Sequence, residues 1–190
     1  MSTPTSDPLD VLLAHNHWAT QRVLELCRPL SREQFHRSFP IGPGENGGLH
    51  ATLTHIVGCM RRWADRIAEA PVRPSIERAQ GGPSGAVGDG EHTVAELSAL
   101  LNDATDGLRR TIDLCKARGL DTRISMRFGD KTYTFTRGAA LAHVLTHGHY
   151  HRAQCVNMLR HLGVPGVSDR LPELDVCDWQ AETELPGVKA

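Results

Sequence analysis

An apolar stripe in residues 49–67 constrains the fold of this chain most strongly. The stripe repeats at intervals of four and three residues and consists of Leu49, Leu53, Ile56, Met60, Trp63 and Ile67. This spacing places all six side chains on one face of an α-helix, as in a helix that packs inside a bundle. We therefore predict a buried helix that ends before Pro71, and a fold in which other helices cover its apolar face.

Three further segments predict long helices, because each has a capping residue at its start and apolar residues at helical spacing. They cover about residues 8–27, 93–119 and 136–163, and a short helical turn is expected from residue 31 to about 36. Residues 123–135 instead alternate between apolar and polar, with a Gly-Asp turn in the middle, which predicts a small hairpin. The expected fold is all-α: a four-helix bundle with a hairpin inserted before the last long helix.

The remaining segments predict loops and a single domain. Residues 40–48 and 71–92 are rich in glycine and proline, and the second of these is long enough to line a site. The tail at 168–190 has no strong pattern. We expect one domain over residues 1–190, with a core at about 8–165 and a tail at 166–190 that packs on the bundle or extends from it.

Charge and composition argue against several classes of protein. The net charge is −1, which does not favour nucleic acid or an anionic membrane as the main partner. No stretch reaches the roughly 20 apolar residues of a membrane span, and the first residues do not resemble a signal peptide. Five scattered cysteines without a CxxC pair are typical of reduced thiols, so we predict a cytoplasmic protein.

Residues 143–154 read H-V-L-T-H-G-H-Y-H-R-A-Q and contain the strongest chemical signal. His143, His147 and His151 are four residues apart, so they share one helix face, whereas His149 lies on another. Two imidazoles one turn apart can hold a single metal ion. Three such rings beside apolar residues would repel one another if charged and would be costly to bury without partners. The pattern favours a metal site, and the alternative is a solvated polar face.

A third ligand should come from another helix of the bundle. His55 borders the apolar stripe and is the best candidate, with His15 and His17 as competitors. Three protein ligands with an open position are typical of a catalytic metal. Zinc, nickel, iron and copper all suit imidazole ligands.

Three motifs, N-H-W-A near the N-terminus, L-T-H-I at residues 53–56 and T-H-G-H-Y-H-R-A-Q at 146–154, resemble those of the DinB/YfiT family. The resemblance covers about residues 9–165. It implies a four-helix bundle that forms a homodimer and holds zinc, nickel or iron through His55, His147 and His151. His143 and Arg152 would then support the ligands without binding the metal.

The resemblance also implies a thiol S-transferase, in which the metal activates a small-molecule thiol such as bacillithiol, mycothiol or glutathione for attack on an electrophile. Arg62 or Arg152 could meet a carboxylate of that thiol, and the alternative is that each is a solvated helix arginine. A hydrolase is the weaker option, because the only acids on the second helix, Asp65 and Glu69, come well after the histidine.

Two other readings stay open: a non-catalytic metal-binding protein of the stress response, and a helical interaction module with incidental histidines. The sequence does not decide whether the protein is an enzyme, and it assigns no catalytic residue.

Overall fold

The structure is a computed structural model, and it describes residues 7–41, 47–77, 91–167 and 175–184. It is mostly helical, with one small antiparallel sheet. In chain order the elements are α1 (Pro8–Cys27), α2 (Arg32–His36), α3 (Leu49–Ile67), α4 (Val94–Arg118), β1 (Arg123–Phe128), β2 (Lys131–Thr136), α5 (Arg137–His161) and α6 (Val176–Thr183). The four predicted long helices and the short helical turn are therefore confirmed.

The predicted caps begin these helices. The Asp7 carboxylate accepts hydrogen bonds from the first turn of α1, and the Thr136 hydroxyl accepts one from the first turn of α5. Capping boxes start α2, at Ser31, and α4, at Thr93. Because the first N–H groups of a helix have no partner within the helix, these side chains satisfy them locally. The starts of these four helices could thus be predicted from the sequence alone, whereas α3 begins at Gly48 without a side-chain cap.

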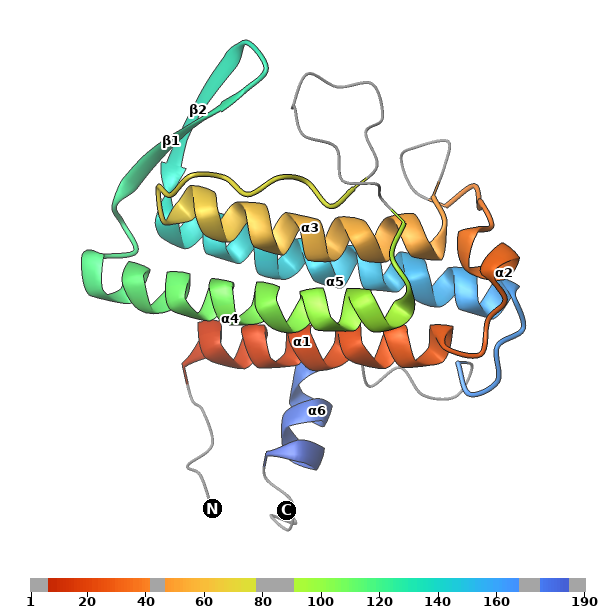
Figure 1. The fold of residues 1–190 in the computed structure, drawn as a ribbon. Helices are drawn as coiled ribbons and strands as arrows, with labels where there is room; N and C mark the ends of the chain where they lie inside the picture. The colour runs from red at the N-terminus through yellow and green to blue at the C-terminus, as the bar shows by residue number, and fades with distance from the viewer. Residues whose placement is uncertain (1–6, 42–46, 78–90, 168–174, 185–190) are drawn as a thin grey trace.

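The four long helices lie side by side around a shared core (Figure 1). α1 and α3 each pack against both α4 and α5. The α3 stripe is buried as predicted, except that Trp63 is half-buried and contacts Phe135 and His143. Each large apolar side chain removed from water contributes about 1.5–3 kcal/mol, so the stripe accounts for much of the packing of α3.

The hairpin is also confirmed. β1 and β2 pair in antiparallel register from Arg123 with Thr136 to the turn at residues 129–130. Gly129 has φ +59° there, a left-handed conformation that glycine adopts without strain. The backbone N–H of Arg137 donates to the carbonyl of Thr122, so the hairpin leads directly into α5, the helix that carries the histidine run.

The tail contains a helix that the sequence pattern did not predict. α6 packs against α1 through Trp179, which is 4% exposed and lies 5.5 Å from the ring of His15 and 6.3 Å from that of Trp18. Eight residues are too few for a clear helical period, and the docking depends on one large aromatic side chain. The tail residues 168–174 and 185–190 lie outside the described residues.

The connection after α3 runs back beside that helix (Figure 1). Arg73 in this segment forms ion pairs with Asp65 of α3 and Asp103 of α4, at 3.0 Å each. These ion pairs hold the connection at Arg73 against the surface of α3 and α4. Residues 78–90 of the predicted loop lie outside the described part of the chain.

Within the described ranges, no helix combines the length and apolar character that crossing a membrane would require. All five cysteines are free thiols: Cys27, Cys59, Cys115 and Cys155 are buried and Cys177 is exposed. The prediction of reduced thiols in the core therefore agrees with the structure for the first four, of which Cys59 lies beside His55.

Candidate metal centre

Three imidazoles from two helices meet between α3 and α5. The Nε2 atom of His147 lies 3.2 Å from Nε2 of His55 and 3.2 Å from Nε2 of His151. The rings of His55 and His151 are 4.8 Å apart, nearly perpendicular. We call these three residues the imidazole cluster. The two helices thus bring together the three residues that the sequence analysis predicted.

Burial favours the neutral form of two of the three rings. Burial, followed by the neighbouring His151, His55 and His143, lowers the pKa of His147 to about 3. His147 is therefore a neutral imidazole with a free lone pair, the form that binds metals. Burial also lowers the pKa of His151. A divalent ion between these nitrogens would replace the repulsion between the rings with coordinate bonds.

A thiol joins this group of donors. Cys59 lies one turn after His55 on α3, with Sγ 3.5 Å from the Nε2 atom of His55. Potential ligand atoms of His55, Cys59 and His147 all lie within 4.8 Å of one another. The described residues thus contain a possible His-Cys-His metal site whose two histidines also belong to the imidazole cluster. The i, i+4 spacing from His55 to Cys59 was the sequence signal for this thiol.

A carboxylate lies next to the Nδ1 atom of His55. Glu77, from the connection after α3, places Oε1 3.4 Å from Nδ1 of His55 and 2.6 Å from Nη2 of Arg62. Hydrogen bonds with Cys59 and then Glu77 outweigh burial and raise the pKa of His55 to about 10. Although burial opposes it, hydrogen bonds from His55 and Arg62 lower the pKa of Glu77. Glu77 lies in a connection without helical periodicity, so it is missed when only the acids on the helices are weighed against a hydrolase.

His151, the second candidate ligand on α5, is also oriented by a neighbouring side chain. Nδ1 of His151 lies 2.7 Å from Oε1 of Gln154. With the amide oxygen as acceptor, Nδ1 carries the proton and the lone pair of Nε2 points at the other imidazoles. This contact explains the glutamine of the H-R-A-Q motif.

Arg152 is buried and is not a solvated helix arginine, contrary to one of the sequence interpretations. It is 1% exposed and donates to Asn16 and Thr20 of α1. A Cβ atom at Gly148 would collide with the Asn16 side chain, so this glycine allows α1 to approach α5 closely. Arg152 therefore fixes α5 against α1 and is not free to bind a ligand. Arg62 is held by Glu77 as well.

The competing histidines lie elsewhere. His15 packs between Trp18 and Trp179, and Nε2 of His17 lies 2.8 Å from the Asn102 side chain. Neither is brought to the imidazole cluster, which leaves His55 as the partner of the α5 histidines.

The other two histidines of the run are exposed. The ring of His143 lies 5.6 Å from that of His147 and 4.8 Å from that of Trp63, so it lies beside the cluster. His149 is exposed on another face, also as expected.

A second group of histidines lies at the α2 end of the molecule, and we call His36, His50 and His92 the stacked cluster. The rings of His36 and His50 stack at 4.2 Å. Nε2 of His50 accepts a hydrogen bond from the backbone N–H of His92, and Nε2 of His92 lies 3.1 Å from the carbonyl oxygen of Ile76. These ring nitrogens face protein groups and not each other.

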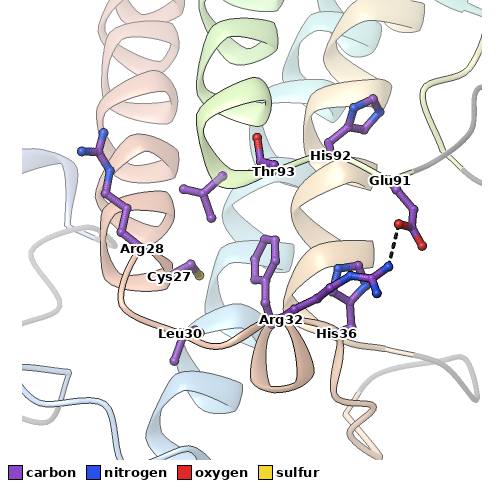
Figure 2. A pocket seen from close by; sticks show the side chains of 10 residues that line it. Cys27, Arg28, Leu30, Arg32, His36, Glu91, His92 and Thr93 are labelled. Carbon is purple, nitrogen blue, oxygen red and sulfur yellow. Dashed lines mark hydrogen bonds and ion pairs between the residues drawn. The ribbon is translucent and has the colours of Figure 1, made fainter.

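A cavity of about 320 Å³ adjoins the stacked cluster and not the imidazole cluster. It lies between the end of α1, α2 and the start of α4, where Figure 2 shows Arg32 and Glu91 reaching toward each other. Their ion pair spans 2.7 Å between two well-exposed side chains. The remaining lining of the cavity is largely apolar and includes Cys27, Leu30 and Phe35.

Comparisons with known proteins give one result. A search of curated proteins finds no match to this chain. The sequence model of the DinB family matches residues 1–178, which include all four long helices and every residue of the imidazole cluster. The chain therefore belongs to the DinB family.

Proposed function

We propose that this protein binds one divalent ion, zinc, nickel or iron, through His55, His147 and His151. In this proposal the four long helices form a four-helix bundle of the DinB type, a single domain whose interior carries the metal. The supporting observation is that Nε2 of His147 lies 3.2 Å from Nε2 of His55 and 3.2 Å from Nε2 of His151. Zinc with three nitrogen ligands at about 2.0–2.1 Å requires neighbouring nitrogens about 3.3 Å apart in a tetrahedral arrangement.

We further propose that the metal serves to activate a low-molecular-weight thiol for transfer to an electrophile. A bound cation of this kind supplies charge that lowers the pKa of a thiol beside it. The chain's own residues hold the geometry: Gln154 orients His151, and Glu77 orients His55. The sulfur of Cys59 supports a thiol as the exogenous ligand, because one sulfur already lies 3.5 Å from a candidate nitrogen donor.

Glu77 supports a second candidate, a metal-dependent hydrolase, because a carboxylate near the metal could act as general base. In the structure, however, its carboxylate faces Nδ1 of His55 and pairs with Arg62. A carboxylate engaged by both groups, on the side of the ring away from the other imidazoles, is better suited to orient His55 than to deprotonate water. A metal-binding stress protein without catalysis is the third candidate, and it predicts no turnover at all.

A thiol-transfer assay tests the enzyme proposal. Metal-loaded protein would be mixed with glutathione, bacillithiol or mycothiol and a generic aryl halide, and the chloride or thioether product measured. We expect turnover by wild type and by His149→Ala, whose altered residue is exposed on the same helix, and none by His151→Ala. Equal rates for wild type and His151→Ala would rule out catalysis by this site.

The homodimer and the cytoplasmic location implied earlier remain predictions. Sedimentation equilibrium of the full chain would test the first, and fractionation of cells expressing the protein would test the second.

A further inference from the structure

Cys59 has the position of a fourth metal ligand. Its side chain is 7% exposed and lies on the same face of α3 as His55, one turn further on. Sγ is 3.5 Å from Nε2 of His55, and it belongs with His55 and His147 to one group of donor atoms. A buried thiol serving only as core packing would be expected among apolar side chains, as a small hydrophobe. This thiol faces imidazole nitrogen.

Three of the six distances among these four donors match the edges of a coordination tetrahedron. With Zn–N of about 2.0–2.1 Å and Zn–S of about 2.3 Å, a tetrahedral ion holds two nitrogens about 3.3 Å apart and a nitrogen and a sulfur about 3.6 Å apart. The structure has two nitrogen pairs at 3.2 Å and one nitrogen–sulfur pair at 3.5 Å. Three edges among four donors therefore already have the lengths that a bound ion would require.

A guanidinium lies beside Cys59. Nη2 of Arg62 lies 3.7 Å from Sγ and donates toward it. The same guanidinium pairs with Glu77, which keeps it in place. The Cys59 sulfur therefore contacts an imidazole and a guanidinium, which are polar groups and not apolar core side chains.

We propose that Cys59 is the fourth protein ligand of the metal, so that the resting site is closed by three histidines and one cysteine. A site with four protein ligands has no open position. An external thiol would then have to take the place of Cys59, whose sulfur would leave the ion and accept the proton that the thiol loses. This displacement step rests on the proposed thiol chemistry, whereas the ligation of Cys59 does not.

Cobalt substitution tests the ligation. Tag-free protein loaded with Co²⁺ should show a thiolate-to-cobalt charge-transfer band in the near ultraviolet and the visible bands of a four-coordinate ion. Cys59→Ser should lose the charge-transfer band and retain bound cobalt through the histidines. Cys155→Ala, which removes another buried thiol on α5, should keep the band.

Persistence of the band in Cys59→Ser, or its absence from cobalt-loaded wild type, would overturn the proposal. If Cys59→Ser fails to fold, X-ray absorption of the zinc-loaded wild type decides the question without a variant. One sulfur neighbour per zinc at about 2.3 Å supports the ligation, and an all-nitrogen and oxygen shell refutes it.

Titration with 2-mercaptoethanol separates this proposal from the proposed thiol chemistry. In cobalt-loaded Cys59→Ser, the added thiol should restore the charge-transfer band, at a concentration at least about tenfold lower than it needs to perturb the band of wild type. If the thiol never restores the band, the displacement step and the thiol chemistry fail together. Ligation by Cys59 would still stand on the spectrum of the wild type.

Discussion

The imidazole cluster and the stacked cluster each gather three histidines, yet their ring nitrogens face different things. In the imidazole cluster, Nε2 of His147 faces the Nε2 atoms of two other rings. In the stacked cluster, Nε2 of His50 accepts a backbone N–H, and Nε2 of His92 meets a backbone carbonyl. The three rings of the imidazole cluster are half-buried, and those of the stacked cluster range from the exposed His36 to the buried His50, so burial alone does not distinguish the clusters.

The difference teaches that a metal site is recognised by convergent lone pairs, not by the number of histidines. A ring nitrogen that is already hydrogen-bonded to the backbone has no lone pair to give without breaking that bond. The stacked cluster therefore stabilises the chain near α2 and the start of α4 through stacking and hydrogen bonds. Among the described residues, no backbone group bonds to the Nε2 atoms of the imidazole cluster, which face one another.

The largest expected effect is on zinc affinity, which should depend on the imidazole cluster and not on the stacked cluster. Loss of a hydrogen-bond partner of a ligand typically costs about 10–100-fold in metal affinity, so loss of a ligand should cost more than about 100-fold. We expect His147→Ala to lose stoichiometric zinc and His36→Ala to retain it. Elemental analysis and calorimetric titration of tag-free protein measure both. Zinc retained by His147→Ala at wild-type affinity would break the comparison.

Lowering the pH should reduce the free energy of unfolding through protonation of His50 in the stacked cluster. Burial, then His36 and His92, lower its pKa to about 4 from the ordinary 6.5. Because the folded-state pKa is depressed, the unfolded chain binds more protons between these values. The stabilisation from a neutral His50 is thus complete above pH 6.5 and is lost as pH falls toward 4.

This loss amounts to about 3 kcal/mol of unfolding free energy at pH 4. His50→Gln keeps an acceptor for the His92 N–H and cannot titrate, so its stability should fall less over the same range. Urea unfolding of metal-free protein at pH 7 and pH 4.5 measures the difference, and parallel pH profiles for the two proteins would contradict it.

A smaller effect should follow from Glu77→Gln. The carboxylate stands 3.4 Å from Nδ1 of His55 and helps to aim Nε2 at the other imidazoles. We expect zinc affinity to fall by about 10-fold, with zinc still bound at one ion per chain. Glu91→Gln, which removes the ion pair beside the stacked cluster, is the matched control and should leave affinity unchanged. Equal affinities for the two variants would mean that Glu77 does not orient the ligand.

The smallest effect is expected for His143→Ala. This ring is exposed and contacts His147 and Trp63 only at ring–ring distances of 5.6 and 4.8 Å. Zinc affinity should stay within about threefold of wild type, because packing against a ligand contributes less than a hydrogen bond to it. A loss as large as that of His147→Ala would add His143 to the ligand set.

The helices of this fold could be predicted because their signals are local. Asp7, Thr93 and Thr136 satisfy backbone groups within the next three residues, and Gly129 turns the hairpin where the alternation breaks. The pairing of His147 with His151 is equally local, since helical geometry alone places residues i and i+4 on one face. α6 escaped prediction because its docking depends on Trp179 meeting a distant helix.

The sequence by itself determined four long helices, a hairpin, a family and a histidine run whose spacing suits a metal. Only the tertiary structure decided which distant groups meet that run. His55 and not His15 faces α5, Cys59 adds a sulfur to the donors, and Glu77 arrives from a connection without periodicity. The physical reason is that helix periodicity orders side chains along one segment, whereas contacts between segments depend on how the helices pack.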